Sequence, residues 1–356
     1  MTAAELQDPD SSPHLKIWLL VQTSWATPLL LQFRFAMSQS NDNHSVHKTQ
    51  SPPIETVPYA SAPYSQRTAG PVGAWAALRH QYLREAALEF IGTFMLVFFG
   101  SSGSLQAVVS SFPAVSSSPK GDIVTGVFGW AAGLSLGVWV ASGSGGHINP
   151  AVTIAVATFR GFPWKKVPVY IGSQVLGGIV ATLISWGNYM HAIHLADPGK
   201  TRLTASCFAI YAGDFLPSAA CFFSEFLGTF LLVFVILAGL DKKNGALPTG
   251  LLPLILFILF IGMGSGLGIN TAYGLNPARD FGPRIGLSIL GYSRSVIWNY
   301  RSQFWIWSGI ISPICGGVVA VALYDTFIYT GDDSILSPTA LSDAEIPLTR
   351  NHAETV

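Results

Sequence analysis

The sequence predicts an all-α membrane protein with six transmembrane helices, two short re-entrant helices and an inverted internal repeat. The first observation is composition: half of the 356 residues are hydrophobic and only 11% are Asp, Glu, Lys or Arg, whereas a soluble domain carries about 25% charged residues. The mean hydropathy of +0.44 agrees with this. The second observation is a set of six long apolar stretches, and the third is a motif that occurs twice.

Each predicted crossing holds roughly 20 mostly apolar residues, the length that a helix needs to cross about 30 Å of hydrocarbon. Two further apolar stretches, 149–159 and 276–290, are too short to cross, and each begins with Asn-Pro-Ala. The six crossings run roughly from Tyr82 to Leu105, Asp122 to Ala141, Val167 to Trp186, Ala220 to Leu240, Leu251 to Asn270 and Phe304 to Tyr329.

Two polar tails flank the membrane domain, which spans residues 81–330. Residues 1–80 and 331–356 are rich in Ser and Pro and in other polar residues, a composition typical of disorder, and we expect both tails in the cytoplasm. The apolar run Ile17–Phe35 has three interpretations: a membrane-surface helix, a weak signal-like segment, or a stretch without a role. We expect the sequon at Asn43 to be cytosolic and unmodified.

An internal repeat relates residues 81–188 to residues 219–330. The twelve residues that begin Glu89-Phe-Ile-Gly-Thr match those that begin Glu225-Phe-Leu-Gly-Thr at eight positions, and the two Asn-Pro-Ala motifs recur at a similar spacing. Each half therefore contains two crossings, a short element and a third crossing. Because three is an odd number, the second half must be upside down relative to the first, which places a shared site near the bilayer midplane.

The basic residues predict that both termini are cytoplasmic, because Lys and Arg favour that side of the membrane. The bias is modest. This topology places Lys48, Arg67, Arg79, Arg84, Arg160, Lys165, Lys166, Lys242 and Lys243 inside, and Lys120, Lys200, Arg202, Arg284, Arg294 and Arg301 on the opposite side.

The two Asn-Pro-Ala motifs are predicted helix starts, because Asn is a favourable N-cap and Pro fits the first helical position. One helix begins at Asn149-Pro150-Ala151 and the other at Asn276-Pro277-Ala278. Each helix N-terminus carries roughly +0.5 elementary charge, and two inverted short helices would meet end to end. The Asn amides would then face a pore that orients a passing oxygen and excludes protons and cations. A single motif would indicate only a capped helix in a loop, but two matching copies favour the pore.

The segments Gly145-Gly-His-Ile-Asn-Pro-Ala-Val-Thr and Gly274-Leu-Asn-Pro-Ala-Arg-Asp-Phe-Gly-Pro closely resemble the signatures of the aquaporin superfamily. With the motifs at Glu89 and Glu225, the resemblance covers about Arg84 to Tyr329. It implies six tilted helices plus two half-helices in the lipid bilayer, assembled as a homotetramer with a pore in every subunit. It also implies a channel of the plasma membrane, not an enzyme.

In this superfamily an arginine and three partners form a selective constriction on the extracellular side. Arg279 matches the arginine, and Tyr273 and Gly264 match two partners by ungapped spacing from the second motif. An ungapped count from the first motif gives Gly129 as the fourth residue, whereas shortening the preceding loop by one residue gives Trp130. The neighbouring residues also align in the second case, so we assign Trp130.

The resemblance implies passive flux of glycerol and water, with other small neutral solutes as further substrates and a water-selective channel as the alternative. Aromatic faces suit the carbon side of glycerol, while Arg279 and backbone carbonyls suit its hydroxyls. Water-specific relatives place His where Gly264 leaves space. Asp280 and the segment Phe208-Ala-Ile-Tyr211 also resemble the glycerol-conducting branch.

Three further titratable residues are candidates for a role. Glu89 and Glu225 lie inside apolar spans, where ionisable residues are functional by default. They are either proton relays or substrate sites, or they accept backbone N–H bonds from the re-entrant loop of their own half, which their symmetric positions favour. His147, near the expected cytoplasmic mouth, is either a gate or an ordinary loop histidine. We expect His191 and His194 at the surface.

Other classes fit the sequence less well. A coupled secondary transporter also uses inverted repeats and broken helices, but it needs ion ligands at the midplane, where this chain has neutral amides. A membrane-embedded enzyme needs clustered catalytic or metal-binding residues, and the sequence shows no such set and no cofactor motif. The balance of 19 basic and 19 acidic residues provides no footprint for nucleic acid, and three cysteines form no disulfide framework. A junction protein with a closed pore stays an open alternative.

Overall fold

The computed structural model describes residues 83–245, 247–331 and 334–336. The run Ile17–Phe35 and the sequon at Asn43 lie outside these residues, as do the whole of 1–80 and most of 331–356. The described residues fold into helices and connections without a strand.

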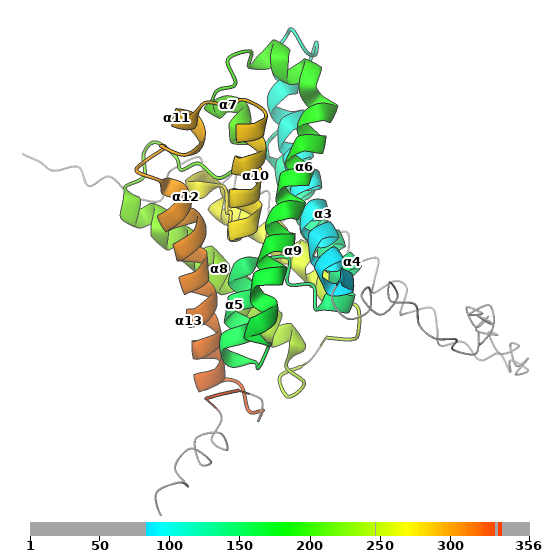
Figure 1. Ribbon diagram of the computed structural model, residues 1–356, viewed down its shortest axis with the longest axis vertical. Coiled ribbons are helices and arrows are strands. Elements are labelled where there is room, and N and C mark those ends of the chain that lie inside the picture. The colour runs from blue at the N-terminus through cyan, green and yellow to red at the C-terminus, as the bar shows by residue number, and fades with distance from the viewer. Residues whose placement is uncertain (1–82, 246, 332–333, 337–356) are drawn as a thin grey trace, which may run out of the picture. The chain divides into compact units, whose positions relative to one another are not determined.

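Six helical segments of the described chain are long and apolar enough to cross a membrane, as predicted (Figure 1). The third continues to Ala196, beyond the predicted end near Trp186, and the last contains a π-helical stretch, η4, before Pro313. The segments are α3 (Arg84–Ser110), α4 (Ile123–Val140), α6 (Val167–Ala196), α8 (Ser218–Leu240), α9 (Leu252–Thr271), and the run of α12 (Phe304–Ile306), η4 (Trp307–Ile311) and α13 (Ser312–Phe327).

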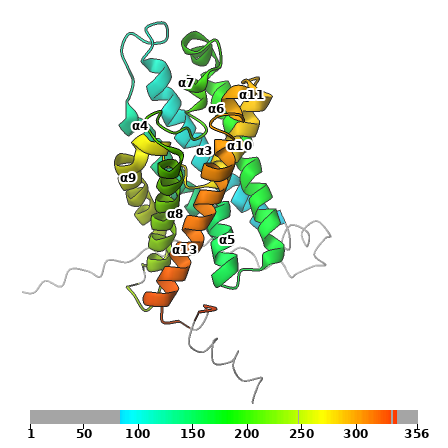
Figure 2. The same ribbon diagram turned by 90° about the vertical axis from the view of Figure 1, so that its left-hand side faces the viewer.

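Two short helices, α5 (Pro150–Phe159) and α10 (Pro277–Ile289), follow the Asn-Pro-Ala motifs. Both ribbon views place α10 in the upper half and α5 in the lower half of the helix bundle (Figures 1 and 2). We call the end that carries α7 (Arg202–Ala205) and α11 (Arg294–Ile297) the upper end, and the opposite end the lower end. The predicted pair of half-helices is therefore present.

The packing of the helices follows the inverted repeat. Within the halves, α3 packs on α4 and α6, and α8 packs on α9 and α13; across the halves, α5 packs on α13 and α10 on α6. Glycines permit the cross-packing, since a Cβ atom on Gly178 would lie 2.9 Å from the carbonyl of Ala278, and one on Gly317 would lie 3.3 Å from that of Ala151. Each half-helix is thus held by the last span of the other half.

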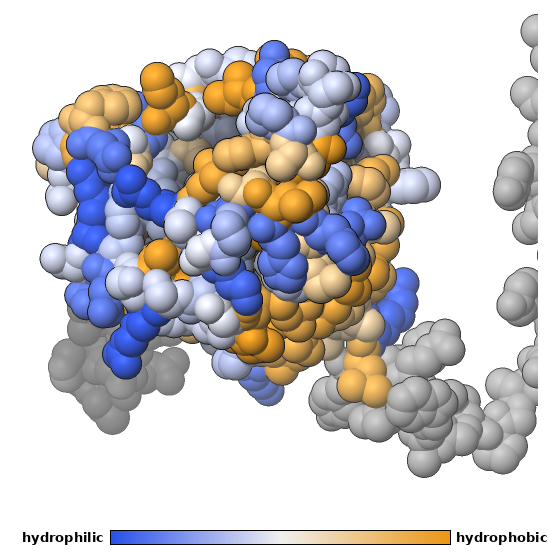
Figure 3. Space-filling view, turned by 90° about the horizontal axis from the view of Figure 1, so that it is seen from above, coloured by the Kyte–Doolittle hydropathy of each residue, from blue (hydrophilic) through white to orange (hydrophobic). Residues whose placement is uncertain are grey.

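The outer surface of the bundle is apolar along its sides. Ile123, Ile269 and Phe327 are 70%, 74% and 79% exposed, which in water would be unfavourable for so many large apolar side chains. Viewed from the upper end, hydrophilic residues gather at the left and across the centre with hydrophobic residues among them, and a hydrophobic flank continues at the lower right (Figure 3). This distribution is that of an integral membrane protein.

Candidate functional site

The two half-helices meet at their N-termini through reciprocal hydrogen bonds. Asn149 donates from Nδ2 to the carbonyl of Leu275 at 2.9 Å, and Asn276 donates from Nδ2 to the carbonyl of Ile148 at 2.8 Å. Each carbonyl belongs to the residue directly before the opposite asparagine. The two Asn-Pro-Ala motifs, 127 positions apart in the sequence, are therefore tied together (149 and 276).

Each asparagine also caps its own helix. Oδ1 of Asn149 accepts from the N–H of Ala151 at 2.9 Å, and Oδ1 of Asn276 accepts from the N–H groups of Ala278 at 2.9 Å and Arg279 at 3.2 Å. Pro150 and Pro277 occupy the first helical position, where no N–H is needed. A side-chain amide has two N–H donors, so one donor on each asparagine remains beyond the bond to the opposite loop.

The residues before the asparagines have strained backbones that aim their carbonyls across the junction. Ile148 has φ of +41° and Leu275 has φ of +54°, values that cost of order 1–3 kcal/mol for a residue other than Gly. Their side chains lie against Gly92 and Gly228, where a Cβ atom would come within 2.5 Å of Ile148 and 2.3 Å of Leu275. A larger residue at Gly92 would also meet the carbonyl of Gly137 at 2.9 Å, whereas one at Gly228 would have to displace the side chain of Leu275.

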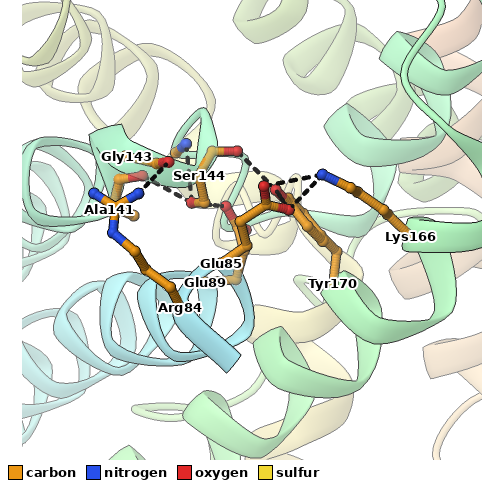
Figure 4. Close-up of polar contacts among 9 residues, drawn as sticks. Arg84, Glu85, Glu89, Ala141, Gly143, Ser144, Lys166 and Tyr170 are labelled. Carbon is orange, nitrogen blue, oxygen red and sulfur yellow. Dashed lines mark hydrogen bonds and ion pairs between the residues drawn. The ribbon is translucent and has the colours of Figure 1, made fainter. Parts of the chain in front are cut away.

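The buried carboxylate of Glu89 binds the first re-entrant loop (Figure 4). Its Oε1 accepts from the hydroxyl of Ser144 at 2.7 Å and the N–H of His147 at 3.0 Å. Its Oε2 accepts from the N–H of Ile148 at 2.7 Å and the amide of Gln174 at 2.7 Å. Both oxygens are therefore engaged by donors from the loop and from α6.

Glu225 binds the second loop in the equivalent way. Oε1 accepts from Thr271 Oγ1 at 2.5 Å and from the N–H of Gly274 at 3.0 Å, and Oε2 accepts from the N–H of Leu275 at 2.7 Å. These bonds to each loop are the ones that a scaffold role requires. They hold the strained residues in place.

A polar cluster at the lower end surrounds the first loop. Tyr170 donates its hydroxyl proton to the carbonyl of Ser144 at 2.8 Å, and Lys166 pairs with Glu85 at 2.8 Å (Figure 4). The ring of His147 lies nearby, with Nδ1 3.2 Å from Thr153 Oγ1 and its centroid 5.2 Å from that of Tyr170. His147 is therefore packed between its loop and the helices α5 and α6. His191 and His194 are exposed, as expected.

A cavity of about 260 Å³ leads from the lower end to the junction of the half-helices. Leu240 and Leu252, at the lower ends of α8 and α9, border it at one end, and Asn276 and Arg279 border it at the other. Between them the wall is mostly aliphatic, with His147 and Asn149 among the polar exceptions; the aliphatic residues include Val152, Val156, Leu232, Ile236 and Leu256. A few polar groups on an apolar wall suit uncharged solutes.

Arg279 and Trp130 lie face to face at the upper side of the junction. The guanidinium carbon of Arg279 is 3.8 Å from the ring centroid of Trp130, and its Nη1 donates to the carbonyl of Phe208 at 3.0 Å. Gly129 instead faces α3, where a Cβ atom would lie 2.7 Å from the carbonyl of Phe99. Of the two candidates for the fourth residue of the selective constriction, or filter, Trp130 is thus the one beside Arg279.

Gly264 and Tyr273 are also neighbours. A Cβ atom on Gly264 would lie 2.7 Å from Val127 Cγ2 and 3.1 Å from Tyr273 Cζ, so the expectation that Gly264 leaves open space is wrong. Because Gly264 has no side chain, Val127 and the ring of Tyr273 occupy the volume instead. The ring of Tyr273 packs edge-to-face on Phe260, with centroids 5.6 Å apart.

Asp280 directly follows Arg279 on α10, and its side chain is buried. Oδ1 accepts from the N–H of Ile210 at 2.8 Å, and Oδ2 accepts from Arg284 Nε at 2.9 Å. The residue that resembles the glycerol-conducting branch therefore contacts the connection that contains Phe208 and Tyr211.

Several residues of the junction were not predicted. Thr93 and Thr229 lie four residues after the buried glutamates, and their hydroxyls are each 3.4 Å from the carbonyls of Ile148 and Leu275. The internal repeat could have identified these threonines, because Gly92-Thr93 and Gly228-Thr229 are identical in its two halves. The carboxylate partners Ser144, Gln174 and Thr271 had no such signal, because the two halves use different residues.

Comparison with known proteins agrees with this geometry. The major intrinsic protein family matches residues 77–324. Aquaporin-7-1 of Laccaria bicolor is 49% identical over 275 residues, which cover 76% of this chain and 82% of that protein. Probable aquaglyceroporin-2 of Gibberella zeae is 38% identical over 317 residues, covering 85% and 91%.

A solved structure is also similar. The X-ray structure of the aquaglyceroporin from Plasmodium falciparum matches with a TM-score of 0.62 and 28% identity, over 69% of this chain and 97% of that one. The sequence match, the half-helices and the six spans point to one conclusion. The chain belongs to the major intrinsic protein family and is an aquaporin-family channel of the membrane, not an enzyme.

Proposed function

We propose that this channel conducts glycerol and water passively, together with other small neutral solutes. The observation that carries the proposal is the stacked pair of Arg279 and Trp130, with Tyr273 nearby. A guanidinium has five N–H donors, and within the described residues Arg279 uses one side-chain donor, to Phe208. The free donors suit glycerol hydroxyls, and the aromatic faces suit its carbon side.

The junction of the half-helices supports exclusion of protons. Two helix N-termini, each with a partial positive charge, point at one place, and Asn149 and Asn276 each keep an amide donor beyond the bond to the opposite loop. A solute oxygen that accepts from both turns its own hydrogens away from a continuous hydrogen-bonded chain. Cations meet the positive ends of the helices there.

The topology and assembly follow as parts of the same proposal. We place both termini in the cytoplasm, so that the upper end and Arg279 face outward, and we assign residues 1–80 and 331–356 to cytoplasmic tails around a channel domain at 81–330. We further propose a homotetramer in the plasma membrane. His147, which lines the cavity, would then lie on the cytoplasmic side of the junction.

Stopped-flow light scattering on proteoliposomes tests the proposal. We expect both water and glycerol to equilibrate much faster than in protein-free vesicles of the same lipid. Fast water with glycerol at the protein-free rate would identify a water-selective channel, and no acceleration of either solute would contradict an open channel. Glycerol uptake driven by a proton or sodium gradient would instead identify a coupled transporter.

A further inference from the structure

The half-helix α10 carries a buried ion pair one turn beyond the filter arginine. Arg284 Nε donates to Asp280 Oδ2 at 2.9 Å, and the two side chains are 0% and 1% exposed. A buried ion pair is a weak source of stability, because the loss of hydration offsets much of the attraction. The pair is therefore explained better by what it holds in place.

Ile210, in the connection above the pore, is held at both of its backbone groups. Its N–H donates to Asp280 Oδ1 at 2.8 Å, and its carbonyl accepts from Arg284 Nη2 at 2.6 Å. The remaining branch of the guanidinium, Nη1, donates to the carbonyl of Ile297 at the end of α11 at 2.6 Å. Hydrogen bonds with an ionised partner are roughly twice as strong as neutral ones, so Ile210 is tightly held.

Ile210 lies two residues after Phe208, whose carbonyl accepts the hydrogen bond from Arg279. Because only Ala209 separates the two residues, a displacement of the backbone at Ile210 would be passed on to Phe208. The helix that carries Arg279 therefore also carries the two side chains that fix the acceptor for Arg279. Neither Asp280 nor Arg284 borders the cavity described above.

We propose that Asp280 and Arg284 are positioning residues that set solute selectivity. They hold the Phe208 carbonyl, and through it the orientation of the Arg279 guanidinium over Trp130. This inference rests on the proposed glycerol function for its selectivity readout, but its geometric part can be tested without glycerol.

The variant Arg284→Lys tests the proposal. A lysine ammonium can still pair with Asp280, but it lacks the planar fork that reaches the carbonyls of Ile210 and Ile297 together. If Arg279 loses the stabilisation of about one hydrogen bond in its glycerol-binding orientation, the glycerol-to-water permeability ratio should fall by about fivefold. Asp280→Asn, which keeps an acceptor for Ile210 but removes the charge, should lower the ratio less.

Arg160→Lys is the matched control, because Arg160 forms a similar ion pair with Asp325 at the lower end, with side chains 12% and 0% exposed. It should leave the ratio unchanged.

The second readout is modification of Cys207, which is buried and adjacent to Phe208. Cys207 is exposed to a thiol reagent that does not cross membranes, and its modification is followed by mass spectrometry. It should be modified faster in Arg284→Lys than in the protein without substitutions or in Arg160→Lys.

The outcomes separate the two proposals. If the chain without substitutions conducts water but no glycerol, the proposed function fails. The rate of Cys207 modification still decides whether Asp280 and Arg284 have the positioning role. If Arg284→Lys lowers both permeabilities by the same factor and Cys207 stays as protected as in Arg160→Lys, the pair is merely structural and the inference is overturned. If Arg284→Lys does not fold, the same comparison is made with Asp280→Asn.

Discussion

Gly264 shows how one missing side chain shapes the packing at the proposed constriction. The volume that a side chain would fill is taken by Val127 and by the ring of Tyr273, so the glycine acts by admitting its neighbours. Close-packed interiors tolerate added volume poorly. Any residue larger than glycine at this position must displace the ring of Tyr273 or the side chain of Val127.

Gly264→Ala should therefore reduce glycerol permeability more than water permeability. The added Cβ would lie 2.7 Å from Val127 Cγ2 and 3.1 Å from Tyr273, and overpacking of this kind costs about 1–3 kcal/mol. The double variant Gly264→Ala, Val127→Ala makes room for the methyl group and should recover part of the glycerol flux. Stopped-flow measurement of both solutes checks this, and an equal loss of both without recovery would contradict it.

The sequence predicted the arrangement of the proposed filter residues only in part. Arg279 and the two asparagines could be predicted because they lie within contiguous motifs. Trp130 needed a decision about loop length, which the contact with Arg279 supports on geometry. Arg284 was counted among the basic residues of the outer side, whereas it is fully buried. A basic side chain in a sequence does not reveal its acceptors, which here are the carboxylate of Asp280 on the same helix and two backbone carbonyls of other segments.

At the scale of the elements, the half-helices are positioned by their loops. Two buried carboxylates hold these loops, and each loop supplies the carbonyl that binds the opposite asparagine. The sequence predicted the elements themselves, because apolar length and Asn-Pro starts are local signals. It placed the end of α6 near Trp186, since the continuation to Ala196 includes polar residues such as His191 and His194 that lower the local hydropathy. It could not reveal the π-helical stretch in the last span.

Glu89→Gln distinguishes a scaffold from a proton relay. Glu89 receives four donors on two oxygens, so a glutamine amide in either orientation would direct its NH₂ group at two donors. A buried unsatisfied group costs about 1–3 kcal/mol, and each kcal/mol lowers the melting temperature by about 2–4 °C for a domain of this size. We expect a clearly lower melting temperature in detergent.

Glu85→Gln is the control for this variant, because Glu85 lies one turn earlier on α3 and its pair with Lys166 is exposed, at 38% and 46%. Surface pairs of this kind contribute little, so its melting temperature should barely change. A stable Glu89→Gln protein with altered proton permeability in vesicles would instead support the relay.

At the scale of the whole molecule, the six spans differ in how well a single chain covers them. The apolar window of α9 is 22% buried, whereas those of the other spans are 39–44% buried. Helices in lipid gain from packing against other helices rather than from burial alone. A span that packs so little within its own chain is the best candidate to contact another copy, and we expect α9 to lie at the subunit interface of the proposed tetramer.

Fluorescence quenching by brominated lipids tests this expectation. Ile258 on α9 and Leu176 on α6 are 58% and 52% exposed in the single chain, so labels at Ile258→Cys and Leu176→Cys start from similar accessibility. Cys315→Ser removes the least buried native thiol, since Cys207 and Cys221 are buried. If α9 lies between subunits, brominated lipids should quench the label on α6 strongly and the label on α9 weakly, and a detergent that separates the subunits should abolish the difference. Equal quenching of the two labels in the bilayer would show that α9 faces lipid, and the assembly would then have to form through another face.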